Sequence, residues 1–538
     1  MRSISTSIST FSKLIESNCL YVDKTEYIYR MVKAPFGQYF YSRPRRFGKS
    51  LTVSTLEAVF AGQKNLFEGL WIYESDYEWA KYPIIHIDFG RSDSTSKENL
   101  EKWIGKELAG IAKSNGVEIS GDSPALMFGE LIKALYNKES KGVVILIDEY
   151  DRPVTNNIED GRRVDEIRIM MEAFYQMIKG YESMLRFVFL TGITRLSQVS
   201  IFSKLNNLED ISRRTEYSSM VGYTDEELDR YFDDYIREGA SKLNCTENEL
   251  KASLTKWYDG FRFAPNGKSV YNPVSIGQFF NNGCEFGNYW YATATPVMLV
   301  NQAKKQKLTI EDIENAVFTD VSYNSFDLMS LAGDELNTQM LVQLLFQTGY
   351  LTFGDRIQGT INPAYKLVYP NYEVRQSFEM ELTSIYAGQG VQEINSMVTL
   401  VQQAAGVGDV DRMMSVLKSM FASVPYDLHL KYEKYYQSLL FLTFKMCGMD
   451  VVAEDRTNIG RIDAVLRSGE YIYVIECKLD KSAEKAIEQI EAKKYAEKFE
   501  IDKELCKKII WIGMNFSYDD NIRNIESYRV EDISMSSR

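Results

Sequence analysis

The chain of 538 residues has little histidine, scattered cysteine and no long apolar run. Its only two histidines, His86 and His429, offer few ligands for the usual zinc sites and little for catalytic triads that need a histidine. A bound metal is therefore expected to be held by carboxylates, hydroxyls and phosphates, the donors that Mg²⁺ prefers. The six cysteines include no C-x-x-C pair, and we interpret them as reduced thiols of a cytoplasmic protein: Cys19, Cys245, Cys284, Cys447, Cys477 and Cys506.

Membrane and nucleic-acid-coating functions are also disfavoured. No apolar stretch approaches the roughly 18 residues that a membrane helix needs, and residues 1–17 contain no apolar core of the kind that a signal peptide has. We therefore expect no membrane partner. The net charge of −13 argues against a protein that coats nucleic acid by overall attraction, but it allows an enzyme with a local basic channel. The length predicts two to four domains.

A basic loop is present at residues 41–51, YSRPRRFGKSL. It ends as a phosphate-binding loop G-x-x-x-x-G-K-[ST] does, but Arg43 stands where that pattern has its first glycine. A strand pattern at 38–41 precedes the loop, and apolar residues at helical spacing follow it. In this context Lys49 would reach the β- and γ-phosphates and Ser50 would bind Mg²⁺. The alternative is a solvated basic turn.

A second motif, which is acidic, follows the basic loop about 100 residues later, in KGVVILIDEYD at 141–151. Residues 143–147 form a continuous apolar run, which is typical of a buried parallel strand. Asp148 and Glu149 stand at its carboxyl end, where open α/β sheets bind ligands. Asp148 would hold Mg²⁺ through its water shell and Glu149 would orient the attacking water, although an aliphatic strand that ends in Asp-Glu also occurs by chance. Two more strands are predicted at 82–89 and 186–192.

Four segments together resemble the AAA-ATPase-like domain of a group of prokaryotic proteins. They are YVDKT (21–25), SRPRRFGKSL (42–51), LIDEYD (146–151) and LTGITRLSQVSIFSKLNNL (190–208). In that group Arg-Pro-Arg-Arg-Phe-Gly-Lys-Ser is the usual phosphate loop, so the resemblance implies an ATP site that lacks the first glycine as a family habit. It also places Arg195 like the sensor arginine of signalling-type P-loop ATPases, with a surface arginine as the alternative. The expected nucleotide-binding residues are Arg43, Pro44, Arg45, Arg46, Phe47, Gly48, Lys49, Ser50, Leu51, Asp148 and Arg195.

The middle of the chain is predicted to be mostly helical. A capping box at 224–227 opens a helix of about fifteen residues, which would begin the lid of an AAA-type module. The turn-rich segments 257–263 and 270–276 also match the family and are interpreted as structural loops. An apolar helix at 341–346, two strands and a helix from Tyr372 are compatible with a winged-helix module.

Two carboxylates and a lysine fall close together in the last 110 residues. Asp463 lies in one predicted strand of a hairpin, and Glu476 and Lys478 lie in the next. Because strand side chains alternate, Glu476 and Lys478 share a face from which Cys477 points away. The predicted elements run helix, three strands, helix, strand, at 432–447, 451–457, 460–469, 471–479, 482–499 and 507–516.

This pattern predicts a metal-dependent hydrolytic site. Asp463 and Glu476 would bind Mg²⁺, and Lys478 would stabilise or position the nucleophilic water. Glu433 on the preceding helix would complete the metal site, and Gln489 on the following helix would line it. An aspartate inside an apolar strand is costly unless it binds something. The alternative is a surface hairpin with a salt-bridged Glu-x-Lys.

These residues resemble the PD-(D/E)XK nuclease domain that follows the same ATPase in that group of proteins. The proline of the superfamily name is absent, since Ile462 precedes Asp463, a variation that the superfamily tolerates. The matching segments are 433–436, 460–463, 476–478, 489–490 and Tyr495.

We therefore expect an α/β multidomain chain that couples two activities. Its predicted domains are a P-loop AAA-like ATPase domain with a parallel sheet (1–220), a helical lid (221–300), a helical or winged-helix-like middle domain (301–425) and a restriction-endonuclease-like α/β domain (426–538). The expected function is ATP binding and hydrolysis coupled to cleavage of nucleic acid with Mg²⁺ or Mn²⁺, with DNA favoured over RNA and a homo-oligomer compatible with it. The alternative is a nucleotide-regulated signalling switch whose C-terminal domain binds nucleic acid or protein without cleavage.

Overall fold

The protein is described here by a computed structural model, which divides into two compact units. The first unit comprises Met1–Gln302 and Glu311–Arg375, and the second comprises Ala303–Ile310 and Gln376–Arg538. Each unit is considered by itself, and the domain borders expected from the sequence stay predictions. The described residues are 1–158, 160–195, 207–294, 299, 302–303, 308, 310–325, 338–387, 390–423, 436, 440–441, 443–444, 450–456, 461–493, 508–518 and 524–532.

A five-stranded parallel sheet forms the core of the first unit, with the strand order β2-β3-β4-β1-β5. Every residue of β3 is buried, as a continuous apolar run predicts for a strand with both faces covered. The strands predicted before, within and after the two motifs are confirmed. They are β1 (Gly37–Ser42), β2 (Ile84–Asp88), β3 (Val143–Asp148) and β4 (Leu185–Gly192), and β5 (Glu209–Asp210) adds a short edge.

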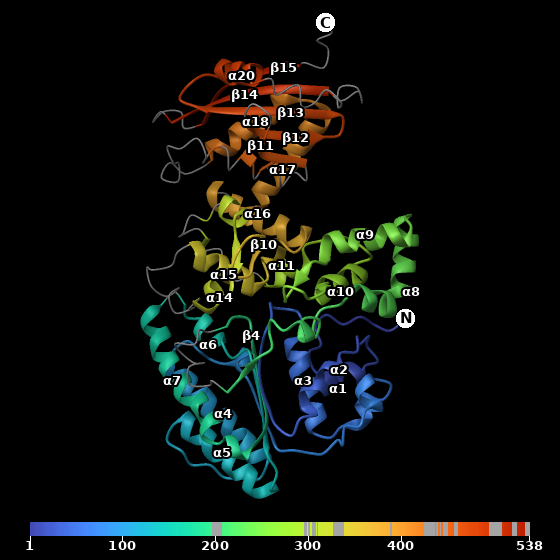
Figure 1. The fold of residues 1–538 in the computed structure, drawn as a ribbon, viewed down its shortest axis with the longest axis vertical. Helices are drawn as coiled ribbons and strands as arrows, with labels where there is room; N and C mark the ends of the chain where they lie inside the picture. The colour runs from blue at the N-terminus through green and yellow to red at the C-terminus, as the bar shows by residue number, and fades with distance from the viewer. Residues whose placement is uncertain are drawn as a thin grey trace. The chain divides into compact units, whose positions relative to one another are not determined.

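Helices cover both faces of this sheet (Figure 1), with α1, α2 and α3 on one side and α4, α5 and α7 on the other. The layers are those of a doubly wound α/β domain. The α-helices are α1 (Phe11–Glu16), α2 (Thr25–Val32), α3 (Lys49–Phe60), α4 (Lys97–Ser114), α5 (Pro124–Glu139), α6 (Arg152–Thr155) and α7 (Gly161–Gly180). Short 3-10 turns lie at Lys64–Phe67, Trp71–Glu74, Phe89–Arg91, Glu182–Met184 and Thr215–Tyr217.

A helical region follows the sheet. The predicted capping box is confirmed, because Thr224 Oγ1 accepts from Glu227 N at 3.3 Å while a Glu227 oxygen accepts from Thr224 N at 2.9 Å. The helix it opens has 19 residues rather than about fifteen. Its apolar side packs with the next helices around Phe232, Leu254 and Phe279. The elements are α8 (Asp225–Leu243), α9 (Glu247–Tyr258), β6 (Phe261–Arg262), β7 (Ser269–Val270), α10 (Pro273–Asn281) and α11 (Tyr289–Ala294).

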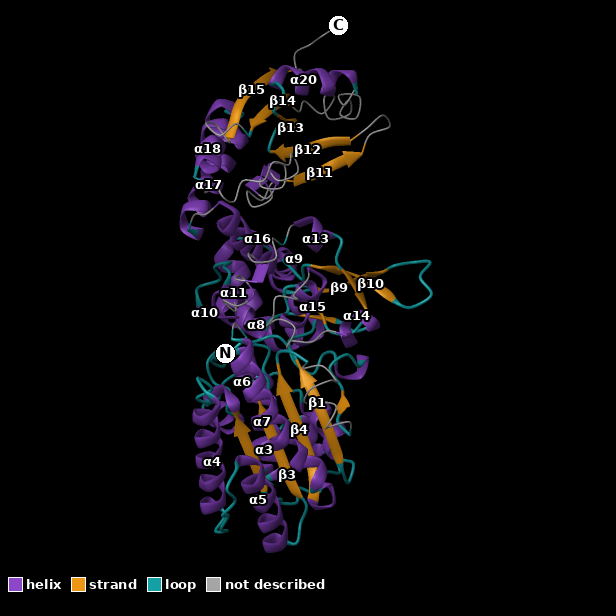
Figure 2. Ribbon diagram, turned by 90° about the vertical axis from the view of Figure 1, so that its left-hand side faces the viewer, coloured by secondary structure: helices purple, strands orange, loops and turns teal. Residues whose placement is uncertain are grey.

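A small antiparallel sheet with the strand order β8-β10-β9 completes the first unit. The helix, hairpin and helix expected in this part of the chain are present as α15, β9, β10 and α16, and Figure 2 shows β9 and β10 as a projecting hairpin. The winged-helix module itself stays a prediction. The helix α15, which precedes that hairpin, is buried on most of its surface, including Gln343 and Gln347, so it does not offer a free face for a DNA groove. The elements are α13 (Ile310–Glu314), β8 (Val317–Thr319), α14 (Asp320–Ser325), α15 (Thr338–Thr348), β9 (Thr352–Arg356), β10 (Ala364–Val368) and α16 (Tyr372–Ala387).

Glu373, in the first turn of α16, is a buried carboxylate with three donors. Its Oε1 accepts from Trp290 N at 2.5 Å and from Tyr291 N at 3.4 Å, and its Oε2 accepts from Ser275 Oγ at 2.7 Å. Burial raises the pKa of Glu373 from 4.5 to about 7, against the lowering effect of these hydrogen bonds. The carboxyl group ties α10 and α11 to the start of α16.

Glu373 is expected to make the stability of the chain depend on pH. Between pH 4.5 and about 7 the folded chain keeps the Glu373 proton while the unfolded chain releases it, so the free energy of unfolding falls as the pH rises through this window. Glu373→Gln cannot ionise and is expected to remove this loss, which is on the order of 3 kcal/mol. Urea unfolding of the variant and the wild type at both ends of the window measures the difference, with exposed Glu285→Gln as the control. Parallel pH profiles for wild type and Glu373→Gln would contradict the assignment.

The second unit is built on a mixed five-stranded sheet with the order β11-β12-β13-β14-β15. Only β13 and β14 run parallel, and the other neighbours are antiparallel. The predicted strands and hairpin are confirmed, whereas β15, α17 and α18 were not predicted. The elements are α17 (Val391–Val407), α18 (Val410–Ala422), β11 (Asp450–Arg456), β12 (Arg461–Ser468), β13 (Tyr471–Leu479), α20 (Ala483–Ala492), β14 (Lys508–Ser517) and β15 (Asn524–Asp532).

The two faces of this sheet carry separate apolar clusters. Tyr473, Ile475 and Cys477 belong to the cluster that includes α17 and α18, whereas Ile472 and Val474 pack with α20 on the other face. The alternation predicted for β13 is thus confirmed, because Cys477 lies on the face opposite to Glu476 and Lys478. Most of the helix predicted at 432–447, and the end of the one predicted at 482–499, lie outside the described residues. Among the helices that the structure describes, none is long and apolar enough to span a bilayer.

Candidate functional site

The basic loop connects the end of β1 to the start of α3, as the sequence predicted. The left-handed backbone angles in the loop belong to Arg46, with a φ of 66°, and to Gly48, with a φ of 100°. Gly48 is the N-cap residue of α3, and glycine adopts this angle without steric cost. Arg43 does not have a positive φ, so the missing first glycine causes no backbone strain at that position.

The side chain of Arg43 is buried beneath the loop rather than directed at a ligand. Its Nη1 donates to Ser42 O at 2.8 Å and to Ser212 O at 2.7 Å, and its Nη2 donates to Tyr217 O at 3.1 Å. The guanidinium lies 4.2 Å from the Tyr41 ring centre and 4.3 Å from that of Phe263. Burial lowers the pKa of Arg43. Arg43 therefore anchors the loop to the segment that follows β5.

Lys49 closes the loop on itself. Its Nζ donates to Arg43 O at 3.0 Å and to Pro44 O at 2.9 Å, and the side chain is buried. Burial lowers the pKa of Lys49, while the charges of Glu149 and Asp148 oppose that shift. The ammonium group thus lies at the centre of the loop and close to the acidic end of β3.

Ser50 and Asp148 form a pair of oxygen donors next to the loop. Burial raises the pKa of Asp148, and the hydrogen bond with the Ser50 side chain lowers it in part. Asp148 Oδ1 also accepts from Glu149 N at 3.0 Å. A hydroxyl beside a buried carboxylate is a donor set that fits Mg²⁺.

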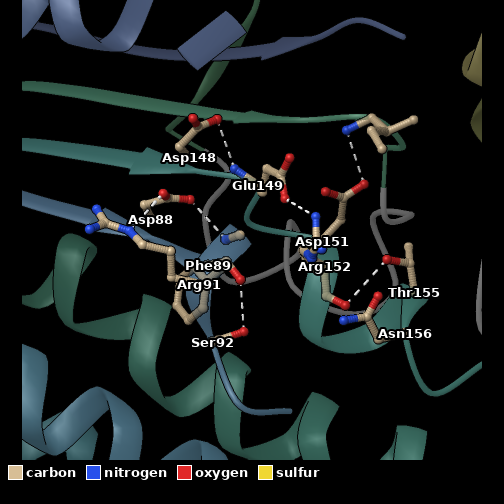
Figure 3. Close-up of polar contacts among 12 residues, drawn as sticks. Asp88, Phe89, Arg91, Ser92, Asp148, Glu149, Asp151, Arg152, Thr155 and Asn156 are labelled. Atoms are coloured by element: carbon tan, nitrogen blue, oxygen red, sulfur yellow. Dashed lines mark hydrogen bonds and ion pairs between the residues drawn. The ribbon is translucent and has the colours of Figure 1, made fainter. Parts of the chain in front are cut away.

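Glu149 follows with a left-handed φ of 51°, which is unusual outside glycine. Its Oε2 accepts from Arg152 Nη1 at 2.6 Å (Figure 3). Asp88 stands at the end of β2, directly beside Asp148 in the strand register, and forms its own ion pair with Arg91. The carboxyl ends of β2 and β3 therefore present three acidic side chains side by side.

A cavity of about 410 Å³ lies at this edge of the sheet. It is lined by residues 45–52 of the loop and α3 and by Glu149 and Arg152. Of the predicted nucleotide-binding residues, Arg43, Pro44, Asp148 and Arg195 are not among its lining residues. Arg195 instead pairs with Asp210 at 3.4 Å, and its backbone N–H donates to Gln347 at 2.8 Å.

Sequence reasoning missed the apolar part of this cavity and the lysine Lys24 that also lines it. Tyr21, Val22 and Lys24 of the YVDKT motif lie along it, and Lys24 Nζ donates to Glu227, on the helical region, at 2.6 Å. The motif was a signal to which no chemistry had been assigned. The apolar lining comes from distant segments and includes Ile8, Leu14, Leu20, Val22, Ile28, Met220, Val221 and Val274.

The C-terminal candidates converge in the second unit. Glu476 Oε1 accepts from Lys478 Nζ at 2.9 Å and from the Gln489 amide on α20. Asp463 Oδ2, on the neighbouring strand β12, accepts from Cys477 N at 2.8 Å. Gly513 of β14 lets α20, which carries Gln489, pack close to the sheet, because a Cβ at Gly513 would lie 2.4 Å from a backbone oxygen of α20. Four of the five predicted residues are thus close together, and Glu433 lies outside the described residues.

Glu476 has the environment of a group that needs a further partner. It is 1% exposed, and its Oε2 has no hydrogen-bond partner within the described part of the chain. Burial and the nearby Asp463 charge raise its pKa to about 7, against the lowering effect of Lys478. A divalent cation would satisfy the orphaned oxygen and offset the repulsion between the two carboxylates. Over the described ranges no group of three or more His, Cys, Asp or Glu side chains can hold a metal, so this pair would need a third ligand.

Comparison with known proteins gives two domain matches and one full-length relative. Residues 5–202 match the family described as "Predicted AAA-ATPase", and residues 431–526 match the "PD-(D/E)XK nuclease superfamily". A protein of Azotobacter chroococcum mcd 1, described as "Uncharacterized protein in vnfD 5'region", is 32% identical over 536 residues, which is 98% of each chain.

Proposed function

Because the chain belongs to the family of proteins that join a predicted AAA-ATPase domain to a C-terminal PD-(D/E)XK nuclease superfamily domain, we propose that it binds and hydrolyses ATP and uses this to control metal-dependent cleavage of nucleic acid. The family matched by the N-terminal part is one of predicted ATPases, and the family matched by the C-terminal part belongs to a nuclease superfamily. The roles of single residues below belong to the proposal.

The nucleotide part of the proposal rests on the loop and on the end of β3. Lys49 would exchange its two loop carbonyls for phosphate oxygens, and the N–H groups at the start of α3 would face the same phosphates. Ser50 and Asp148 would hold Mg²⁺, which neutralises charge on the phosphates when bound. Glu149 would orient the attacking water and take its proton. Arg43 would act as the anchor of the loop.

The nuclease part rests on one observation above all, the buried and unpartnered Oε2 of Glu476 beside Asp463. These two carboxylates would hold Mg²⁺ or Mn²⁺, with Glu433 as the third ligand. The cation would supply Lewis-acid polarisation of the scissile phosphate. Lys478 would stabilise negative charge on that phosphate or position the water, and Gln489 would keep Glu476 in place through its hydrogen bond.

The proposed substrate is nucleic acid, with DNA favoured over RNA. The net charge of −13 means that binding must use a local surface rather than the overall field. A need for ATP favours the cytoplasm as the place of action, and a homo-oligomer is compatible with the proposal.

A second candidate function keeps the nucleotide switch but replaces cleavage by binding. Two observations favour this alternative. Among the described residues no three His, Cys, Asp or Glu side chains come together to hold a metal ion, and Asp463 Oδ2 already accepts a hydrogen bond from the backbone N–H of Cys477. In this alternative the C-terminal domain holds nucleic acid or protein without cutting it.

The bound nucleotide is expected to change the rate at which nucleic acid is cleaved, because one chain carries both the proposed ATP site and the proposed nuclease site. Cleavage of a labelled DNA duplex and of single strands in Mg²⁺ should differ between ATP, ADP and no nucleotide, and initial rates measure it. Equal rates in the three conditions would mean that the two parts act independently. Cleavage of none of these substrates, with DNA or RNA retained on the protein, would favour the binding function.

A further inference from the structure

Arg152 is a cation at the phosphate end of the cavity to which the proposed function gives no role. It lies three residues after Glu149, and a backbone hydrogen bond from Arg152 N to Glu149 O at 3.0 Å closes the turn between them. The guanidinium donates to Glu149 Oε2 at 2.6 Å. The left-handed backbone of Glu149 is the kind of strain that persists only where surrounding groups hold it, and such strain gathers at functional sites.

The backbone at Arg152 is held in place by hydrogen bonds of the neighbouring residues. It opens the short helix α6, and Asn157 beyond that helix donates to Ser94 O at 2.7 Å and to Pro153 O at 2.9 Å. On the other side of the turn, Asp151 accepts from Thr194 N and Thr194 Oγ1, both at 2.7 Å. These hydrogen bonds hold the backbone on both sides of Arg152.

The carboxylate of Glu149 is confined from a second direction. A Cβ at Gly90 would lie 2.9 Å from Glu149 Oε2 and 2.7 Å from Asp88 Oδ1, so only a glycine lets these acids approach the backbone there. Figure 3 shows Arg152, at the start of α6, directed at Glu149. The guanidinium is thus a polar group that holds the Glu149 carboxylate in place.

Arg152 is also open to a ligand. It lines the same cavity as Glu149, Lys49 and Ser50, and its side chain is 36% exposed. A guanidinium presents a planar fork of donors, so one edge can hold a carboxylate while another meets a phosphate oxygen.

We propose that Arg152 positions Glu149 and contacts the terminal phosphate of the bound nucleotide, so that it distinguishes ATP from ADP. This inference rests on the proposed ATP site. Without the terminal phosphate the guanidinium neutralises Glu149; with it, Arg152 shares its donors between the phosphate and Glu149, which holds the carboxylate in a fixed position toward that phosphate.

The neighbouring strand provides a matched control. Asp88 and Arg91 form an ion pair at 3.0 Å with the same spacing of three residues, at the end of β2 rather than β3. Arg91 is 73% exposed and is not among the residues that line the cavity. Loss of Arg91 removes an equal charge from the same edge of the sheet without reaching the nucleotide.

The test compares the full chain with Arg152→Gln, Arg152→Lys and Arg91→Gln. ADP and a non-hydrolysable ATP analogue are titrated in Mg²⁺ by calorimetry. Arg152→Gln is expected to weaken binding of the ATP analogue about tenfold or more and to change ADP binding less than about twofold, because only the charge-assisted contact to the terminal phosphate is lost. Arg152→Lys should recover part of the preference, and Arg91→Gln should bind both nucleotides as the wild type does. In turnover, Arg152→Gln should lower kcat more than it raises KM.

Two results would overturn the inference and are distinct from a failure of the ATP site. In the first result, Arg152→Gln shows the same preference for the ATP analogue over ADP as the wild type. In the second result, Arg152→Gln and Arg152→Lys each lose affinity for the ATP analogue and for ADP to the same extent. In either case the wild type still binds nucleotide. Absence of binding by the wild type would instead overturn the proposed ATP site itself.

Discussion

Lys49→Ala is expected to raise the Kd for ATP by roughly 100-fold or more. The buried ammonium is held at the centre of the loop by Arg43 O and Pro44 O, and in the proposed complex it makes charge-assisted hydrogen bonds to two phosphates. Each such bond contributes roughly 1.5–3 kcal/mol, so the loss of two removes most of the phosphate affinity. Titration of ATP in Mg²⁺ by calorimetry measures the change.

The control is Lys106→Ala, which removes an exposed lysine from α4 of the same unit. It should leave ATP binding unchanged, and both variants should keep the far-ultraviolet circular dichroism of the wild type. Equal affinity of Lys49→Ala and wild type would mean that the loop is the basic turn that the sequence also allowed.

Glu476→Gln and Asp463→Asn are each expected to weaken Mn²⁺ binding at the C-terminal site by roughly 100-fold or more, because each removes a charged oxygen ligand from a site that has few. Glu476→Gln keeps an oxygen that can accept from Lys478 and Gln489. The two carboxylates repel each other when no cation lies between them, so the thermal midpoint should hold or rise slightly. Calorimetric titration with Mn²⁺ and thermal unfolding of the full chain measure both effects.

Glu488→Gln is the matched control, since Glu488 is an exposed acid directly before Gln489 on α20. It should bind Mn²⁺ as the wild type does. If Glu476→Gln and Asp463→Asn also kept wild-type Mn²⁺ binding, the metal site would lie elsewhere and the two acids would be a structural pair.

Local patterns were sufficient to predict the parts of the site that lie on one strand. The apolar run before Asp148 predicted a buried strand because its composition alone reports that both faces are covered. The alternation along β13 predicted that Glu476 and Lys478 share a face, because a strand has a fixed period of two. The pairing of the two hairpin strands predicted that Asp463, on the neighbouring strand, lies near Glu476 and Lys478.

Contacts between distant segments were beyond the reach of such patterns. Arg43 bonds to Ser212 O and Tyr217 O, which lie 169 and 174 residues away, so its anchoring role has no local signal. The same holds for the apolar cavity lining and for the burial of α15 in the first unit. The placement of Arg195 beside Asp210 was open in the sequence and is decided by the fold around β5.

Two features had a local signal that was not used. Glu149 and Arg152 are three residues apart just after a strand, a spacing that brings side chains together when the chain turns into a helix. The helices α17 and α18 bury residues at helical spacing, such as Ile394, Val398 and Val401 in α17. Strand β15 is different, because it is an edge strand with few buried residues and its pattern is correspondingly weak.

Asp463, Glu476 and Lys478 are proposed to form a metal-dependent nuclease site, and a cleavage assay is the direct test of this proposal. The full chain is incubated with Mn²⁺ or Mg²⁺, with and without ATP, and with single- and double-stranded DNA and RNA, beside Glu476→Gln and Lys478→Ala. The wild type is expected to cut at least one substrate only when metal is present, and Glu476→Gln is expected to cut none. Lys478→Ala is expected to bind Mn²⁺ but to lose most of the cleavage rate. Metal-independent cleavage, equal cleavage by Glu476→Gln, or no cleavage of any substrate by the wild type would contradict the proposal.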